Sequence, residues 1–228
     1  VEGLRPRVPS ASLEFGQTIH RALARFFQGR ESAIDVFLTT WEQFRDAPLR
    51  YSCRESWDKL NERGHALLAK FLLDELPRLS CVEASEKPFE LAVSNLDLPF
   101  VGVIDLKARV DGVLSVIDFK TSGSAYQEFE VELSDQLTAY RLAEPQAAQS
   151  ALCVFVKTKE PRIEWFFSQR TGDELTAYLA KVALIGHQIA DEVFYKRPGK
   201  WCAQCDYLPL CMGDNQRAEE TLVAIDLD

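Results

Sequence analysis

The feature that most constrains the fold is a pair of β-rich runs joined by Asp111-Gly112. The two runs are Val101–Val110 and Val113–Lys120. An Asp-Gly dipeptide between such runs is the strongest short-range signal for a hairpin with a two-residue turn. That turn would place Asp105 directly across from Asp118, with their Cβ atoms about 5 Å apart. Because Lys120 lies two positions after Asp118, its side chain should point to the same sheet face.

Two carboxylates and an ammonium on one sheet face suggest a hydrolytic site. Like charges directly opposite each other destabilise a sheet, so a cation is expected between the carboxylates. Carboxylate oxygens are hard ligands that suit Mg²⁺ or Mn²⁺, and a lysine beside them can orient water or stabilise charge during phosphodiester hydrolysis. The alternative is an ordinary hairpin with solvent-facing charges, and these residues alone do not decide between the two.

Five motifs, in this order, resemble the RecB-like branch of the PD-(D/E)XK nuclease superfamily. They are Phe15–Leu23 with its His20, Gly102-x-x-Asp105, Ile117–Thr121, Gln136-x-x-x-Tyr140 and Trp201–Cys211. The resemblance spans residues 15–211. It implies an α/β, restriction-endonuclease-like fold, with a mixed sheet flanked by helices and a C-terminal cysteine segment.

The resemblance also implies a metal site. Asp105 and Asp118 would be the carboxylate ligands, joined by the imidazole of His20 and the backbone carbonyl of Phe119. The chain departs from the family pattern in two ways. Ile104 stands where a proline is usual, and the acidic residue before the lysine is aspartate rather than glutamate, which shortens its reach but keeps its charge.

Three further residues would complete the catalytic set. Lys120 would be the catalytic lysine. Gln136 and Tyr140 are four residues apart and therefore share one helix face. Tyr140 could equally be a core residue of an amphipathic helix.

Three of the six cysteines form a motif near the C-terminus. Cys202, Cys205 and Cys211 have C-x₂-C-x₅-C spacing, which suits soft-metal ligation by thiolates. The resemblance implies a [4Fe–4S] cluster that staples this segment to the N-terminal part of the chain, so the thiols should converge near the start of the first helix. Zinc is the rival metal for three cysteines.

A [4Fe–4S] cluster normally takes four cysteines, and in the resembled family the remaining one lies upstream of the histidine helix. The chain begins at Val1, and no cysteine precedes His20. We therefore expect an N-terminally truncated fragment from which the fourth ligand is missing. The alternatives are that Cys53 or Cys81 supplies the fourth thiolate, or that the cluster is lost.

The pattern of apolar residues predicts the remaining elements. Helices are expected over 13–28, 33–45, 57–76, 131–143 and 172–195, and strands over 82–93, 100–110, 151–157 and 163–168. Ser12 is a candidate cap for the first helix. Together with the resemblance, this layout predicts a single nuclease domain over 1–213, with the cysteine segment at 201–211, followed by an acidic, solvated tail at 214–228.

Composition supports a folded domain but argues against a DNA enzyme. A chain of 228 residues with 46% hydrophobic residues can form one substantial core. No apolar stretch approaches the ~20 residues of a membrane span and no signal peptide is recognisable, which predicts a cytoplasmic protein with no membrane partner. The net charge of −9 opposes phosphate binding, although the local field matters more than the total.

Basic residues gather in three places that could supply such a local field. These clusters are Arg21, Arg25 and Arg30; Lys157, Lys159 and Arg162; and Lys196, Arg197 and Lys200. Scattered surface cations are the alternative reading of each cluster.

Three functions follow from these residues and the resemblance. The first is a Mg²⁺- or Mn²⁺-dependent DNA exonuclease that binds DNA with single-stranded or duplex ends and prefers single-stranded or frayed ends. It would serve recombination, repair or phage DNA metabolism, with a helicase or recombination protein as a candidate partner. The second is a CRISPR-adaptation nuclease that trims spacers. The third is a catalytically silent nucleic-acid-binding scaffold subunit, against which the intact Asp105, Asp118 and Lys120 set counts.

Overall fold

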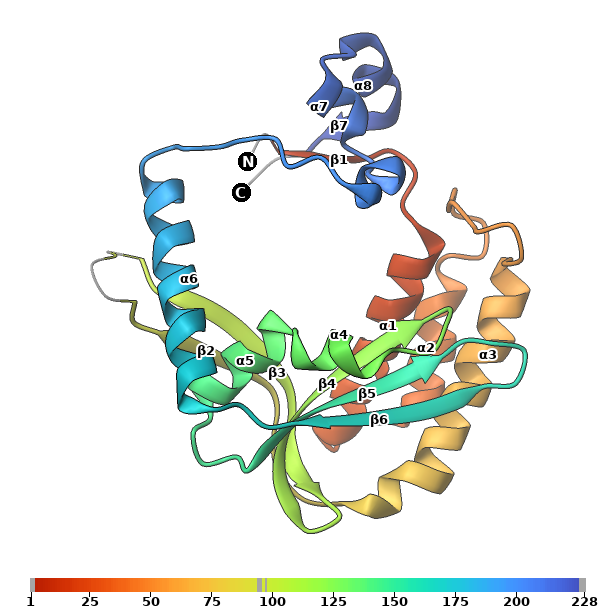
Figure 1. Ribbon diagram of the computed structural model, residues 1–228. Helices are drawn as coiled ribbons and strands as arrows, with labels where there is room; N and C mark the ends of the chain where they lie inside the picture. The colour runs from red at the N-terminus through yellow and green to blue at the C-terminus, as the bar shows by residue number, and fades with distance from the viewer. Residues whose placement is uncertain (1–2, 94–95, 97, 226–228) are drawn as a thin grey trace.

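The chain folds around a mixed β-sheet with helices on both faces (Figure 1), in a computed structural model that describes residues 3–93, 96 and 98–225. The strands of this sheet are β2 (Leu79–Leu91), β3 (Phe100–Val110), β4 (Val113–Ser122), β5 (Gln149–Val156) and β6 (Arg162–Ser168). They lie side by side in chain order. The β4–β5 pair is parallel and the other neighbouring pairs are antiparallel. The expected α/β fold with a mixed sheet flanked by helices is confirmed.

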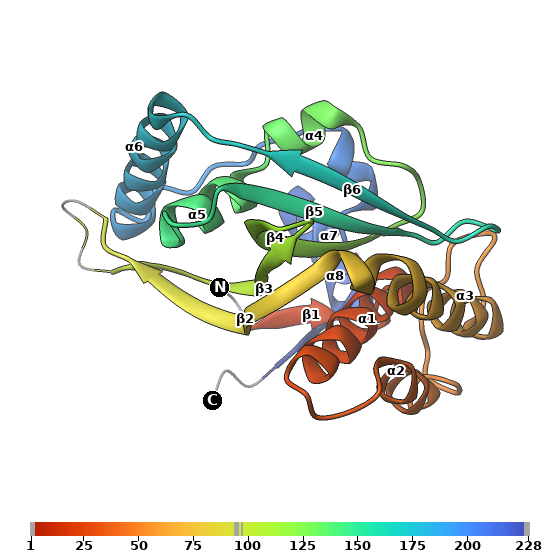
Figure 2. The same cartoon turned by 90° about the horizontal axis from the view of Figure 1, so that it is seen from below.

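Helices cover the sheet on both sides, as the view from below shows (Figure 2). One face carries α1 (Ala11–Phe27), α2 (Ala33–Glu42) and α3 (Trp57–Lys70), and the other carries α4 (Glu128–Glu132) and α5 (Asp135–Ala143). A π turn (Phe71–Glu75) and a 3-10 turn (Leu76–Arg78) extend α3 toward β2. The chain continues after β6 with α6 (Gly172–Ala190), the 3-10 turn η3 (Lys200–Gln204), α7 (Leu208–Met212) and α8 (Asn215–Thr221).

Strand β5 lies in the middle of the core and is apolar on both faces. Alternate side chains join the core under α1–α3 and the core under α4–α5; the first set is Ala151, Cys153 and Phe155, and the second is Leu152, Val154 and Val156. Because a strand covered on both faces can bury every side chain, its sequence reads as a continuous apolar run rather than an alternation.

Glycine 64 is required by the close packing of α3 on α2. A Cβ atom at this position would lie 1.9 Å from Cζ of Phe37, whose ring is fully buried. We expect Gly64→Ala to lower the free energy of unfolding by about 1–3 kcal/mol, because overpacking outweighs the better helix propensity of alanine. Urea denaturation measures this change. Gly172→Ala is the control, since a Cβ there meets nothing within 4 Å, and equal stability of the two variants would contradict the packing argument.

Some element ends differ from the sequence-based expectations because side chains take other partners. Ser10, not Ser12, occupies the N-cap of α1. The Ser12 hydroxyl instead accepts a hydrogen bond from Lys157 Nζ at 2.7 Å. Lys157, expected in a surface basic cluster, is buried and forms an ion pair with Glu55 at 2.7 Å.

Two expected helices are shorter in the structure. The single helix predicted over 131–143 is divided into α4 and α5, because the Ser134 hydroxyl caps α5 by accepting a hydrogen bond from the backbone of Leu137. The final long helix ends at Ala190 rather than Tyr195, and the chain then runs without regular structure to Gly199.

The two ends of the described chain pair with each other. Strand β1 (Leu4–Pro6) is antiparallel to β7 (Leu222–Ala224), and Asp214 caps α8 by accepting a hydrogen bond from the backbone of Arg217. The acidic segment was expected to be a solvated appendage. Its described acidic side chains are exposed, but residues 215–224 form a helix and a paired strand; residues 226–228 lie outside the described part. No helix within the described ranges is long and apolar enough to cross a membrane.

Candidate active site

The hairpin between β3 and β4 has the predicted turn and register. Both Asp111 (φ 49°) and Gly112 (φ 85°) adopt positive φ, as a two-residue type I′ turn requires. Pairing runs from Val110 opposite Val113 to Leu106 opposite Ile117.

The ladder stops at Asp105. Beyond Leu106, β3 and β4 diverge (Figure 1), and the backbone N–H of Phe119 donates to Oδ2 of Asp105 at 2.8 Å. Ile104 and Leu106 belong to opposite core clusters although they are two positions apart, so the side-chain alternation breaks at the residue between them. On the other edge of β3, Asp105 falls opposite Glu86, which has a φ of 51°. The carboxylate therefore turns toward β4 at a break in the sheet.

Asp118 is buried with an incompletely satisfied carboxylate. Its side chain is 0% exposed, and Lys120 Nζ lies 2.8 Å from Oδ2. This ion pair is the contact that Oδ2 makes within the described residues, where no backbone N–H or hydroxyl donates to it. Burial raises the pKa of Asp118 to about 6; the Lys120 charge opposes this shift and the Asp105 charge adds to it.

A chain of hydrogen bonds from α5 holds Lys120. Its ammonium donates to Oε1 of Gln136 at 2.7 Å, and the Gln136 amide donates to the hydroxyl of Tyr140 at 2.9 Å. The Tyr140 hydroxyl donates to the backbone carbonyl of Val103 at 2.7 Å and lies 3.4 Å from Oδ1 of Asp118. Burial raises the pKa of Tyr140, helped by the charges of Asp118 and Asp105, so the phenol stays neutral and can donate.

His20 reaches the site from the opposite face of the sheet. Its Nδ1 atom lies 3.4 Å from Oδ2 of Asp105, and its ring packs edge-on against that of Phe119. Helix α1 approaches β4 closely because Gly16 has no side chain: a Cβ there would lie 3.0 Å from Oγ1 of Thr121. The Phe15-Gly16 pair that precedes His20 is thus explained by the packing of α1 against β4.

All seven of the predicted catalytic and metal-site residues lie in one place, the break between β3 and β4: His20, Asp105, Asp118, Phe119, Lys120, Gln136 and Tyr140. Sequence reasoning missed Glu86, whose pKa is raised by burial and by the Asp105 charge. Glu86 lies on β2, and the sequence around it contains no recognisable motif. Its positive φ is the feature that distinguishes it from its neighbours on the strand.

The donor set fits a hard divalent cation, although its members do not surround a single point. Within the described ranges, no group of three His, Cys, Asp or Glu side chains forms a complete metal site. Among the described residues, however, the neighbouring carboxylates of Asp105 and buried Asp118 have one ammonium beside them, that of Lys120 at 2.8 Å from Oδ2 of Asp118, and therefore lack full charge compensation. A cation beside Asp105 and Asp118 would supply it.

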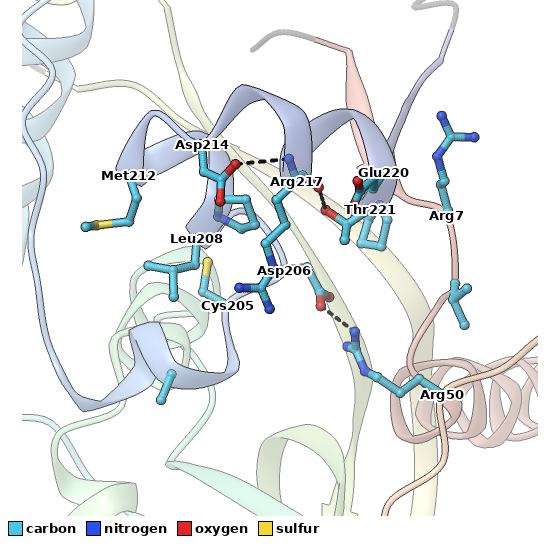
Figure 3. Close-up of a pocket in the computed structure, with 14 residues that line it drawn as sticks. Arg7, Arg50, Cys205, Asp206, Leu208, Met212, Asp214, Arg217, Glu220 and Thr221 are labelled. Atoms are coloured by element: carbon cyan, nitrogen blue, oxygen red, sulfur yellow. Dashed lines mark hydrogen bonds and ion pairs between the residues drawn. The ribbon is translucent and has the colours of Figure 1, made fainter.

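The cysteine segment lies apart from this site, against the N-terminal strand. Tyr207 donates to the carbonyl of Leu4 at 3.2 Å, and Asp206 forms an ion pair with Arg50 at 2.6 Å. Cys205 and the guanidinium of Arg217 line a pocket of about 450 Å³ beside this pair (Figure 3).

The expected return of the segment toward the start of the chain is seen, but convergence of its thiols is not. Cys202 accepts a hydrogen bond from the backbone of Gly199, and Cys205 and Cys211 are exposed. Across the described residues, no three cysteine thiols are grouped as metal ligands, and neither Cys53 nor Cys81 joins the motif in such a group.

Comparison with known proteins connects this geometry to a family. A family model described as the PD-(D/E)XK nuclease superfamily matches residues 1–212. No curated protein matches the chain. Among solved structures, a proposed exonuclease from Eubacterium rectale has a TM-score of 0.50 and 12% identity, with 79% of this chain and 69% of that one covered. The protein SSO0001 has a TM-score of 0.41 and 19% identity, over 56% of this chain and 59% of its own. At such identities the likeness concerns the fold alone.

Proposed function

Because the chain belongs to the PD-(D/E)XK nuclease superfamily, we propose that it is a metal-dependent DNA exonuclease of the RecB-like branch. The observation that carries this proposal is the buried Asp118 carboxylate, which lies beside a second carboxylate, Asp105, and has the Lys120 ammonium at 2.8 Å as its ion-pair partner. A buried charge with so little compensation is costly in a purely structural hairpin. A catalytically silent scaffold would gain nothing from keeping it.

Each residue has a role in this proposal. Asp105, Asp118 and His20, with the backbone carbonyl of Phe119, would hold Mg²⁺ or Mn²⁺. When bound, the ion would supply Lewis-acid activation of water and of the phosphate.

The organic groups would do the positioning. Lys120 would orient the attacking water and stabilise negative charge on the phosphate. Gln136 would keep the ammonium aimed at the site through its 2.7 Å hydrogen bond. Tyr140 would fix Gln136 in turn, because its own hydroxyl is anchored on Val103.

Digestion of end-labelled DNA tests the activity. Single-stranded, duplex and circular substrates are incubated with Mg²⁺, Mn²⁺ or EDTA. We expect cleavage to need the metal and a free end, with mononucleotides or short oligonucleotides as products. Cleavage of a covalently closed circle would show endonuclease action instead, and failure to cut any substrate would favour the nucleic-acid-binding scaffold. Recombination, repair or phage DNA metabolism is the proposed setting, and spacer trimming in CRISPR adaptation is the alternative.

His20 should set the metal preference. An imidazole ligand favours Mn²⁺ over Mg²⁺, because transition metals bind nitrogen better. We expect His20→Ala to lose more activity with Mn²⁺ than with Mg²⁺ and to weaken Mn²⁺ affinity by about tenfold or more, measured by calorimetric titration. His65→Ala on α3 is the control. Unchanged Mn²⁺ affinity in His20→Ala would remove the histidine from the proposed site.

We also propose an iron–sulfur cluster at the cysteine segment. The C-x₂-C-x₅-C spacing and the contacts of Asp206 and Tyr207 with the N-terminal part of the chain support it. Since three thiolates of one motif hold a cluster weakly, we expect substoichiometric iron after anaerobic reconstitution, measured by iron and sulfide analysis. Cys205→Ser should abolish this iron, whereas Cys81→Ser should not. Equal iron content in both variants would contradict the proposal.

A further inference from the structure

The segment between α6 and η3 exposes aromatic side chains that a folded domain normally buries. We define the strap as residues 193–201, with the sequence Val-Phe-Tyr-Lys-Arg-Pro-Gly-Lys-Trp. Phe194 is 68% exposed, Tyr195 is 69% exposed and Trp201 is 58% exposed. Three such rings within nine residues form an apolar surface that calls for an occupant.

The strap is also one of the places where this acidic chain is locally positive. It holds Lys196, Arg197 and Lys200 and no acidic residue, in a chain whose net charge is −9. The three cations are exposed, and no carboxylate of the described residues lies within ion-pair distance of them. Their charge is therefore available to an external anion.

One ring of the strap is held in place. The indole of Trp201 lies against Gly199, where a Cβ atom would be 2.3 Å from the ring. Glycine thus allows the backbone to support the ring, while more than half of the side chain stays exposed. A supported aromatic ring with a free surface loses little entropy when a flat group stacks on it.

The strap lies across from α4, the helix that follows β4. In Figure 1 it runs from the end of α6 toward η3 and α7, on the side of the molecule where α1 begins. In the view from below it passes behind α4 and α5, which agrees with this placement (Figure 2).

We infer that the strap binds single-stranded DNA, with bases stacked on Phe194, Tyr195 and Trp201 and phosphates paired with the intervening cations. Aromatic rings interleaved with Lys and Arg are the elements with which proteins bind single strands without reading sequence. A polypeptide partner would also use the aromatic rings and the arginine, but lysine is depleted at protein interfaces and two of the three cations of the strap are lysines. Duplex bases are already stacked on one another and are unavailable to the rings. The inference rests on the proposed function, because the bound strand would be the substrate that is supplied to the nuclease site.

Binding without cleavage tests the strap. In EDTA, fluorescence anisotropy compares a labelled oligothymidine, an abasic strand of the same length and a duplex. We expect the full chain to prefer oligothymidine. Phe194→Ala or Trp201→Ala should weaken that binding by about fivefold to a hundredfold and leave the abasic strand unaffected. Gly199→Ala should also weaken oligothymidine binding. The added Cβ atom should displace the Trp201 ring, and a change in tryptophan fluorescence would report that displacement.

The cations should behave differently from the rings. Lys196→Ala and Arg197→Ala should weaken binding of both strands and lower the slope of log affinity against log salt by about 0.7 each. Matched controls on the β5–β6 hairpin are Phe167→Ala, an exposed aromatic, and Lys159→Ala, an exposed cation. Ring variants that bind oligothymidine as the wild type does, or a wild type that binds none of the three ligands, would overturn the inference.

Failure of the strap inference can be distinguished from failure of the proposed nuclease function. If Asp118→Asn still degrades DNA while the strap variants lose binding, the catalytic assignment fails and the strap stands. If Asp118→Asn is inactive while strap variants bind and degrade single strands normally, the catalytic assignment stands and the strap inference fails.

Discussion

Asp118→Asn and Lys120→Ala should each reduce DNA cleavage by about a thousandfold or more. The proposed metal loses a charged ligand in the first variant, and the phosphate loses a positioned cation in the second, each a loss of several kcal/mol in the transition state. Both side chains converge at the break between β3 and β4, with Lys120 Nζ 2.8 Å from Asp118. Initial rates on end-labelled single-stranded DNA at saturating Mn²⁺ measure the effect.

The same hairpin offers a matched control. Asp111 is an exposed carboxylate in the turn, paired with Arg78 at 2.7 Å, and Asn-Gly forms the same turn type as Asp-Gly. Asp111→Asn should therefore retain wild-type cleavage. Wild-type rates in Asp118→Asn and Lys120→Ala would show that catalysis, if any, lies elsewhere on the chain.

The site could be predicted from sequence because its central part is local. A two-residue turn fixes the register up to Leu106 opposite Ile117, which brings Asp105 and Asp118 near each other although they are not paired, and helix periodicity links Gln136 to Tyr140. Neither rule needs long-range information. The placement of His20 depended instead on the family resemblance, since nothing within its own helix indicates that α1 approaches β4 at Gly16.

Some expectations failed because of local capping and others because of tertiary contacts. The break between α4 and α5 at Ser134 and the early end of α6 both interrupt a continuous helical pattern. The acidic end of the chain was expected to be a solvated appendage. Its acidic side chains Asp214, Glu219 and Glu220 are exposed, but residues 222–224 pair with β1, a partner more than two hundred residues away in sequence. The break in the β3 ladder at Asp105, which turns its carboxylate toward β4, likewise has no signature in the alternating pattern of its strand.

The cost of the buried carboxylate should be measurable without any substrate. Burial raises the folded-state pKa of Asp118 to about 6, above its unfolded value of 3.8. The folded protein therefore binds more protons than the unfolded chain between these values, and stability falls as pH rises through this window. With metal removed by EDTA, we expect Asp118→Asn to be more stable than wild type by up to about 3 kcal/mol at pH 8, because asparagine has no charge to bury. The two proteins should converge near pH 4.

Divalent metal should reverse that order. A cation that binds only the folded wild type adds about 4.1 kcal/mol at a thousand times its dissociation constant, whereas Asp118→Asn lacks the charged ligand and should gain little. Urea denaturation at pH 4 and pH 8, with EDTA or Mn²⁺, gives all of these differences. Lys120 keeps its hydrogen bond to Gln136 in the variant, so the loss of its ionic partner should cost little. A metal-free Asp118→Asn that is less stable than wild type at pH 8 would mean that the carboxylate is part of the folded framework, and the argument for a cation site at this position would fail.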